Sequence, residues 1–213
     1  MAKRDYGQFC GLVRALEMVG ERWALLIVRD LLVSPKRYTD LREGLPKIPS
    51  NILSTRLKEL EEAGIVHRQV QPPPSRAVVY ELTEYGYELE DIVLRLGRWG
   101  AKSLTMPKPD EIVTVDSMIM AMRSTFCPEA ARDLTTSYEL RMGEIILHMH
   151  IDNGKLTVGA GELPGADLVI ETGPAIKALM TGEMSPADAI KNGSVRLDGD
   201  PRLLARFAET FRI

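Results

Sequence analysis

LPKIPSNILSTRLKELEEAGIVHRQVQPPPSRAVVYELTEYG, residues 45–86, is the stretch of the chain that decides its architecture. Three leucines, Leu53, Leu57 and Leu60, recur at helical spacing and place an apolar stripe on one face of a helix. Ser50 precedes them and is a good N-cap, because its hydroxyl can accept a hydrogen bond from a backbone N–H of the first turn. The sequence therefore predicts a short helix that follows an N-cap at Ser50 and ends at the next glycine.

A hairpin is predicted directly after this helix. Residues 65–71 and 77–83 are rich in β-branched and apolar side chains, which favours two strands. They are joined by PPPSR, in which Pro72–Pro74 stiffen the turn and Arg76 places positive charge at its tip. A helix followed at once by a rigid, basic hairpin is typical of a winged helix-turn-helix, whose helix enters the major groove of DNA.

Further helices are predicted on both sides of this pair of elements. Apolar residues recur there at helical spacing, and glycines and prolines separate the periodic segments. The expected N-caps are Thr39 for a short helix before Ser50 and Thr83 for a long helix after the hairpin. The stripes that define the other helices comprise Leu12, Leu16 and Val19; Trp23, Leu26, Ile27 and Leu31; and Leu89, Ile92, Val93, Leu96 and Trp99.

The side chains off the leucine stripe are suited to nucleic acid. They are short hydrogen-bonding groups and cations, which can reach base edges and phosphates. The alternative is an ordinary solvated helix face, which carries the same residue types, but the order of helices and hairpin favours DNA. The candidate DNA-binding residues are Lys36, Arg37, Ser50, Asn51, Ser54, Thr55, Arg56, Lys58 and Arg76.

Charge and composition are those of an ordinary globular protein. The 213 residues suffice for one large domain or for two of about a hundred residues each. Net charge is -3, yet residues 33–80 hold 8 basic against 5 acidic side chains, and phosphate binding depends on the local field. We expect a cytoplasmic protein with no membrane contact, because two cysteines make no disulfide framework and neither a membrane-length apolar run nor a signal-peptide pattern is present.

The second half of the chain follows a different pattern. Two prolines and three charges in MPKPDE, residues 106–111, interrupt the periodicity, so we divide the chain into domains 1–106 and 107–213. The predicted class of the second domain is α+β, a mostly antiparallel sheet covered by helices, with the Asn153-Gly154 pair as the strongest hairpin signal. The expected strands are residues 137–142, 144–152, 155–161, 166–171 and 194–198, and the expected helices are residues 118–126, 174–181, 186–191 and 201–211.

Residues 8–100 resemble the HxlR-type regulators, a branch related to the MarR winged helices. The resemblance rests on ALEMVGERWALLIVRDLL, on RYTDLREGLPKIPSNILSTRLKELEEAGIVHR and on YELTEYG. It implies a homodimer that binds double-stranded DNA at a two-fold related operator and pairs through its terminal helices. Some relatives sense oxidants through a cysteine at the position of Cys10, usually within a Cys-Pro pair. Here Gly11 follows Cys10, so a redox role competes with that of a small apolar side chain buried near the dimer seam.

Residues from about 113 onward resemble the sterol-carrier-protein type 2 family. The resemblance rests on LHMHIDNGKLTVGAG, ADLVIETG and ALMTGEMSPADAIKNGSVRLDGDPRLLARFAETF. It implies a tunnel between sheet and helices that holds a small hydrophobic ligand. The many methionines of this half suit such an irregular apolar space, although they suit an ordinary core equally well. The candidate pocket residues are Met118, Met122, Met149, Ile176, Leu179 and Met180.

Catalytic and metal-binding patterns are weak. His148, His150 and Asp152 share one strand face, but their span is too long for all three to ligate one ion, and no other ligand cluster completes a site. We therefore expect no metal, no cofactor and no enzyme activity, since no nucleophile triad, phosphate loop or HExxH motif is present. The leading interpretation is a DNA-binding transcriptional regulator modulated by a ligand. The alternatives are a carrier of apolar ligands whose winged helix contacts protein, and a redox regulator acting through Cys10.

Overall fold

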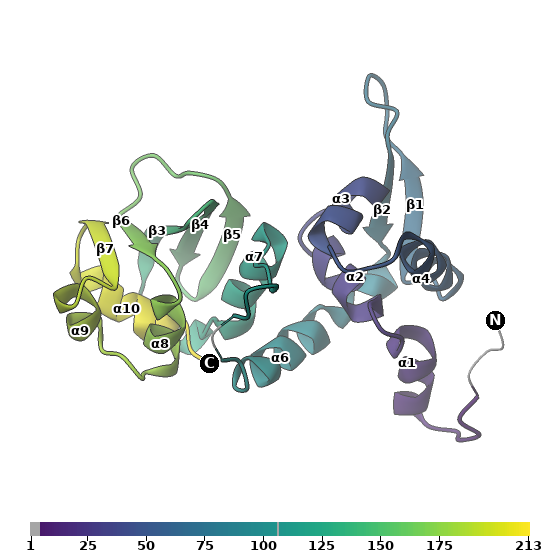
Figure 1. Cartoon of the computed structure of the whole chain (residues 1–213), viewed down its shortest axis with the longest axis horizontal. Helices are drawn as coiled ribbons and strands as arrows, with labels where there is room; N and C mark the ends of the chain where they lie inside the picture. Colours follow the sequence, from purple (N-terminus) through teal and green to yellow (C-terminus); the bar gives the residue numbers. More distant parts are fainter. Residues whose placement is uncertain (1–4, 106) are drawn as a thin grey trace. The chain divides into compact units, whose positions relative to one another are not determined.

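The computed structural model describes residues 5–105 and 107–213 (Figure 1). The chain forms two compact units, one reaching to Val93 and the other running from Leu94 to Ile213. The division falls within the helix Leu89–Ala101. The boundary predicted at 106/107 lies beyond the end of that helix, and Met106 itself is outside the described residues.

The first unit has the element order of a winged helix-turn-helix. Four helices precede a two-stranded antiparallel hairpin, and the strands pair from Val66↔Leu82 to Val70↔Val78. The hairpin projects from the helices as a wing (Figure 1). The elements are α1 (Gly11–Val19), α2 (Ala24–Leu31), α3 (Tyr38–Gly44), α4 (Ser50–Glu62), β1 (Val66–Val70), β2 (Val78–Leu82), α5 (Glu84–Tyr87) and α6 (Leu89–Ala101).

The leucine stripe of α4 forms the centre of this unit, as the periodicity predicted. Leu53, Leu57 and Leu60 are buried, together with Ile27 and Leu31 of α2. Burying a leucine side chain stabilises a fold by roughly 1.5–3 kcal/mol, so this stripe fixes which face of α4 points outward.

The start of α4 differs from the prediction by one residue. Ser50 is the first residue of the helix, and Pro49 occupies the N-cap. The Pro49 carbonyl accepts the Leu53 N–H at 3.0 Å, which closes the first turn one residue early. The prediction that the Ser50 hydroxyl caps α4 is therefore wrong.

The other two predicted caps have different outcomes. The helix expected to start after Thr39 is α3, which starts at Tyr38 with Arg37 at its N-cap, and the Arg37 N–H donates to the Asp40 carboxylate at 2.8 Å. Thr83 is an N-cap, as predicted, and accepts the Gly86 N–H at 3.0 Å. The helix that it caps is the four-residue α5, so the predicted long helix is divided into α5 and α6.

The second unit is an α+β domain built on a five-stranded sheet. The strand order is β5-β4-β3-β6-β7, with β3 and β6 parallel and the remaining pairs antiparallel. The predicted class is confirmed, and the sheet is mixed. Its elements are α7 (Val115–Thr125), the 3-10 turn η1 (Pro128–Ala131), β3 (Thr135–Met142), β4 (Ile145–Asp152), β5 (Lys155–Ala160), β6 (Leu168–Thr172), α8 (Ala175–Thr181), α9 (Pro186–Lys191), β7 (Val195–Gly199) and α10 (Arg202–Thr210).

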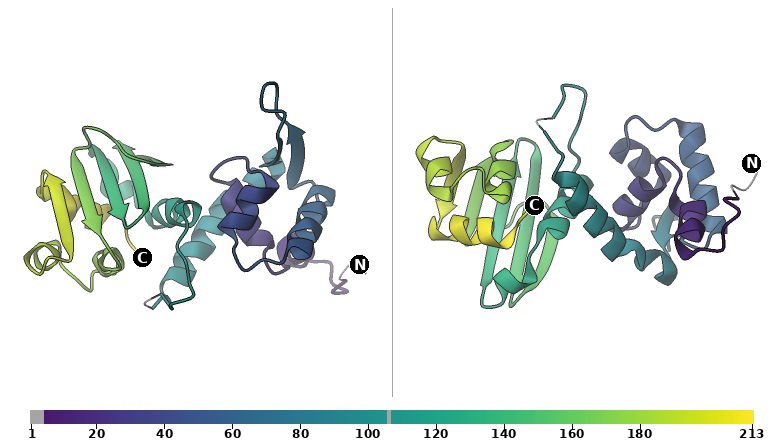
Figure 2. Two further views of the ribbon diagram at one scale, coloured as in Figure 1. Left: turned by 45° about the horizontal axis from the view of Figure 1, so that its top comes forward. Right: turned by 90° about the horizontal axis from the view of Figure 1, so that it is seen from below.

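The core of this domain lies between one sheet face and its helices. Tyr138 of β3 and Met149 of β4 are opposite each other in the register and fully buried. Tyr138 packs edge-on against Phe207 of α10, with ring centroids 5.5 Å apart. Figure 2 shows α10 lying across the strands. Helices in the described part of the chain are all too short or too polar to traverse a bilayer.

Candidate nucleic-acid interface and second-domain cavity

The solvent face of α4 carries the side chains predicted to read DNA. Asn51, Ser54 and Lys58 are exposed, Thr55 is half-buried, and the leucine stripe occupies the opposite face. Lys58 lies 3.6 Å from Glu62 one turn later, and both side chains are mostly exposed. An exposed ion pair of this kind is worth little, so the ammonium group can exchange its partner for a phosphate.

The first turn of α4 is tied to α3 by hydroxyl groups. The Tyr38 hydroxyl donates to the Ser50 carbonyl at 2.8 Å. The Ser54 hydroxyl donates to the same carbonyl at 3.0 Å and lies 3.4 Å from the Tyr38 hydroxyl. The sequence analysis missed Tyr38, because its periodicity signal started α3 at Thr39 and left this side chain in a loop.

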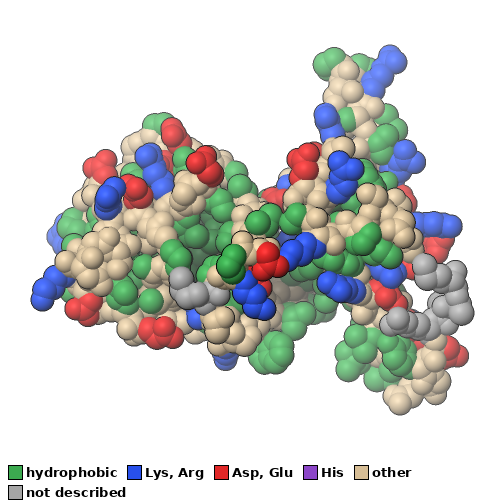
Figure 3. Space-filling view, in the orientation of Figure 1, with side chains coloured by type: hydrophobic (Ala, Val, Ile, Leu, Met, Phe, Trp, Pro, Cys, Tyr) green, Lys and Arg blue, Asp and Glu red, His purple; other side chains and the backbone are tan. Residues whose placement is uncertain are grey.

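The wing is joined to the start of α3 by backbone and side-chain bonds. Lys36 and Tyr80 exchange two backbone hydrogen bonds, of 3.0 and 2.7 Å, which add a third short segment to the hairpin. Arg37 is exposed, and its guanidinium donates to the Ser75 hydroxyl in the wing turn at 3.4 Å. Arg76, which follows Ser75 in the sequence, is exposed and has a left-handed backbone conformation, with φ of 45°. Basic side chains accordingly lie at the end and along the length of the wing (Figure 3).

Arg56 does not belong to this surface. Arg56 is a residue of α4 whose side chain is buried. Its guanidinium pairs with Glu21 at 3.1 Å and with Glu59 one turn along the same helix. The structure therefore separates Arg56 from the other candidate DNA-binding residues, because two carboxylates of its own chain pair with its guanidinium. Glu21 lies far away in the sequence, so helical periodicity alone could not reveal the pair.

The residues predicted to line a ligand pocket lie within the core of the second domain. Five of them are buried and Met118 is half-buried. They come from α7, β4 and α8. Their assignment to a pocket remains a prediction. The five buried residues are Met122, Met149, Ile176, Leu179 and Met180.

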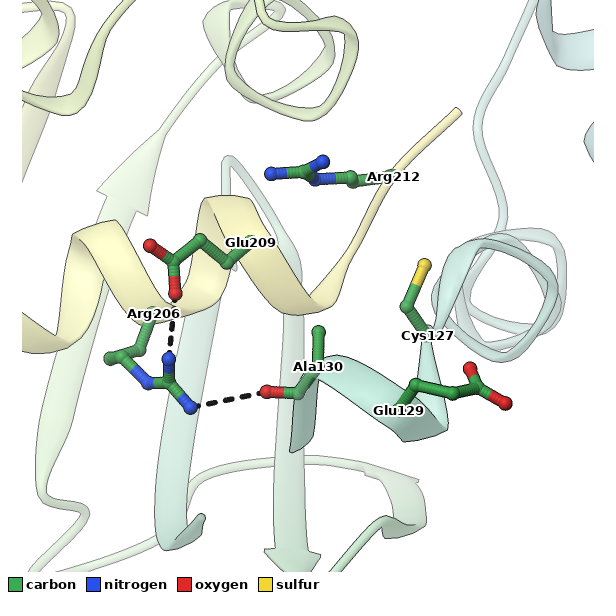
Figure 4. Close-up of a pocket in the computed structure, with 6 residues that line it drawn as sticks. All are labelled: Cys127, Glu129, Ala130, Arg206, Glu209 and Arg212. Atoms are coloured by element: carbon green, nitrogen blue, oxygen red, sulfur yellow. Dashed lines mark hydrogen bonds and ion pairs between the residues drawn. The ribbon is translucent and has the colours of Figure 1, made fainter. Parts of the chain in front are cut away.

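A hollow of about 370 Å³ lies elsewhere in this domain, and a different set of residues lines it (Figure 4). It is open and of mixed charge. The Arg206 guanidinium donates to Glu209 at 2.7 Å and to the Ala130 carbonyl at 3.1 Å, so its charge is largely satisfied. Arg98 donates to the Cys127 sulfur at 3.5 Å. The lining residues are Cys127, Glu129, Ala130, Arg206, Glu209 and Arg212.

Cys10 is exposed and stands at the N-cap of α1. Hydrogen bonds from the backbone N–H groups of Val13 and Leu12 lower the pKa of its thiol, because they stabilise the thiolate. Cys10 is thus accessible to solvent within one chain, and its burial near a dimer seam stays a prediction.

The histidine pair of β4 has a structural partner. His148 Nδ1 lies 3.2 Å from the Gly161 carbonyl oxygen, and its ring packs over Gly159, where a Cβ would collide with it. Among the residues that the structure describes, His, Cys, Asp and Glu side chains form no cluster of three or more suited to a metal ion.

Comparison with known proteins finds a family match in each half of the chain. Residues 18–108 match the HxlR-like helix-turn-helix family, and residues 123–212 match the SCP-2 sterol transfer family. The uncharacterized HTH-type transcriptional regulator YdeP of Bacillus subtilis is 37% identical over 95 residues, which are 44% of this chain and 73% of that protein. The HTH-type transcriptional regulator YodB of the same organism is 40% identical over 85 residues, 40% of this chain and 76% of that protein.

The redox regulator HypR in its oxidized form aligns with a TM-score of 0.43 and 34% identity, covering 46% of this chain and all of that one.

Proposed function

Since the chain belongs to the HxlR-like helix-turn-helix family of transcriptional regulators and carries an SCP-2-like second domain, we propose that it is a dimeric, ligand-modulated operator-binding protein. The observation that carries the DNA part is the division of α4 into a buried leucine stripe and an exposed polar face. Asn51, Ser54 and Thr55 contact base edges in the major groove, and Lys58 contacts phosphate. Ser50, exposed in the first turn of α4, is a further candidate contact, and its backbone carbonyl accepts hydrogen bonds from Tyr38 and Ser54.

The wing contributes phosphate contacts in this proposal. Arg76 is exposed in the wing turn, and Arg37, the N-cap of α3, places its exposed guanidinium against Ser75 of the same turn; Lys36 precedes Arg37 in sequence. Such contacts position a protein on the duplex and carry no sequence information directly. Arg76→Ala should therefore weaken binding to all duplexes similarly, whereas Asn51→Ala should change sequence preference.

A homodimer is proposed from the apolar side chains that one copy leaves exposed. None of the residues of α6, all of which are described, is buried, and Ile92, Leu96 and Trp99 are exposed. In α1, Leu12 and Leu16 are exposed. Large exposed apolar surfaces mark interaction sites, and a second copy that covers these helices would present two recognition helices to a two-fold related operator.

The second domain is proposed to bind a small apolar ligand among Met122, Met149 and the buried face of α8. Methionine side chains repack readily around irregular apolar shapes. A ligand changes operator affinity only if it binds the DNA-competent and DNA-incompetent states with different affinities. Ligand modulation is thus a separate claim from DNA binding and needs its own measurement.

Fluorescence anisotropy with the full chain tests both claims. We expect binding to labelled duplex to weaken steeply between about 50 and 200 mM salt, because phosphate contacts release counterions. At fixed salt, addition of a saturating long-chain fatty acid should shift the affinity for an operator duplex that has been enriched from a randomised library with this chain. Salt-independent binding would overturn the DNA claim. An unchanged operator affinity, with fatty-acid binding shown by calorimetry, would overturn the modulation claim alone.

A second candidate is redox control through Cys10. The exposed sulfur with a lowered thiol pKa favours it, because thiolates react with oxidants and electrophiles. Operator binding by wild type should respond to a disulfide-forming oxidant such as diamide, and binding by Cys10→Ser should not. An equal response of both proteins would exclude Cys10 as the sensor and direct attention to Cys127.

A further inference from the structure

The hydroxyl groups at the start of α4 form a small bonded cluster with a defined direction. Tyr38 is the first residue of α3, and Ser50 is the first residue of α4. The Tyr38 hydroxyl lies 2.8 Å from the Ser50 carbonyl oxygen, and the Ser54 hydroxyl lies 3.0 Å from that oxygen and 3.4 Å from the Tyr38 hydroxyl. The cluster therefore links the two helices of the helix-turn-helix at the end that enters DNA.

The protons of this cluster can be assigned. Each hydroxyl carries one proton and two lone pairs. A carbonyl oxygen only accepts, so the Tyr38 proton points at Ser50. The Ser54 proton has two acceptors in range, the Ser50 carbonyl and the Tyr38 oxygen, and both belong to the protein. Ser54 is exposed, and what it presents to solvent is consequently lone-pair density.

An acceptor on the recognition helix selects the complementary group on DNA. In the major groove, adenine N6 and cytosine N4 donate, whereas guanine O6 and N7, thymine O4 and the phosphate oxygens accept. While its proton stays on these two protein acceptors, the Ser54 hydroxyl pairs with an exocyclic amine and not with a DNA acceptor. The Tyr38 hydroxyl, its proton engaged by Ser50, has none to give a phosphate.

We propose that Tyr38 is a positioning residue for operator recognition, which anchors the first turn of α4 and orients the Ser54 hydroxyl to accept from an adenine or cytosine amine. This inference rests on the proposed DNA-binding function. It adds which partner group Ser54 reads and which residue of α3 sets that preference.

The test couples one protein hydroxyl to one DNA amine. A randomised duplex library is enriched with the full-length wild-type chain, and the selected duplex is then remade with single adenines replaced by purine or single cytosines by 2-pyrimidinone, each lacking only the amine. We expect one position in each half-site at which removal of the amine weakens wild-type binding about 3- to 10-fold, the range of one hydrogen bond.

Two variants and one control complete the cycle. Binding by Ser54→Ala should not change when the amine at that position is removed. For Tyr38→Phe, the logarithm of the fold-change caused by removal of the amine should be at most half of the wild-type value, and the salt dependence of binding should stay as in wild type. The control is Tyr85→Phe, whose hydroxyl contacts Met18 Sδ at 3.8 Å, and it should behave as wild type. The melting temperatures of all variants establish that each is folded.

Three results would overturn the proposal in distinguishable ways. If Ser54→Ala retains the wild-type response at every amine, Ser54 is not the acceptor. If Tyr38→Phe leaves the response unchanged or weakens all duplexes equally, Tyr38 does not position Ser54. If the wild-type chain enriches no sequence, the operator-binding function itself fails, and this inference fails with it.

Discussion

Arg56 is expected to stabilise the first domain through its ion pairs and not to contact DNA. Its side chain is 10% exposed, and it pairs with Glu21, which is 28% exposed, and with Glu59, which is 36% exposed. Removing one member of a fully buried pair costs about 3–5 kcal/mol. Because both carboxylates keep access to water, they are partly solvated once the guanidinium is gone. We therefore expect Arg56→Ala to lower the free energy of unfolding of the first domain by about 2 kcal/mol.

Thermal unfolding measures this effect directly. In a domain of about a hundred residues, 1 kcal/mol shifts the melting temperature by about 4–8 °C, so Arg56→Ala should lower it by roughly 8–16 °C. Below that temperature the variant should bind operator with the wild-type dependence on salt. The matched control is Lys58→Ala, which removes an exposed cation from the same helix. It should leave the melting temperature within about 2 °C and reduce the salt dependence of DNA binding.

The opposite pattern would refute the reasoning. If Arg56→Ala melts like wild type but binds DNA with a shallower salt dependence, Arg56 contacts phosphate, and its ion pairs with Glu21 and Glu59 carry no stability.

Three further predictions concern other parts of the chain. Hydroxyls and a backbone N–H of β3 hold the pKa of the Asp167 carboxyl below its usual range, so its ionised form stabilises the fold. This stabilisation should be complete above about pH 4, near the unfolded-state pKa, and should disappear as pH falls through the folded-state pKa. In urea unfolding, the free energies of unfolding of Asp167→Asn and wild type should therefore converge at low pH and diverge at higher pH. Gly86→Ala should lower the free energy of unfolding by more than about 1 kcal/mol, because its Cβ would collide with a backbone carbonyl next to β1, whereas Gly100→Ala has open space and should be neutral or stabilising. Trp99→Glu, at a side chain that is 71% exposed, should convert a dimer into a folded monomer in analytical ultracentrifugation, and Ile190→Glu should not; equal masses for both variants would exclude α6 from the interface.

The architecture was largely predictable because its determinants are local. The Leu53–Leu60 stripe repeats within one helix, and a turn of three prolines separates two β-branched segments, so both recognition helix and wing follow from short-range pattern. The second-domain strands were found for the same reason, with Asn153-Gly154 marking the hairpin between β4 and β5. The parallel pairing of β3 with β6 was not evident, because it joins strands across an intervening segment.

The candidate site was less predictable because it depends on contacts between distant residues. Arg56 looks like a surface cation until Glu21, from the segment between α1 and α2, is brought beneath it. Tyr38 looks like a loop residue until its hydroxyl meets the Ser50 carbonyl. The N-cap of α4 is Pro49 and not Ser50, because the Pro49 carbonyl accepts the Leu53 N–H and closes the first turn. These features depend on tertiary packing, for which a single helix period carries no information.

Enrichment of a randomised duplex library by the full-length chain, followed by sequencing, tests the central claim most directly. A two-fold dimer of winged helices predicts a consensus of two inverted half-sites with centres about 10–10.5 base pairs apart, or a multiple of that spacing. Enrichment of such a site, lost in Asn51→Ala, would establish sequence-specific reading by α4. Failure to enrich any sequence, or an unchanged consensus in Asn51→Ala, would contradict the account.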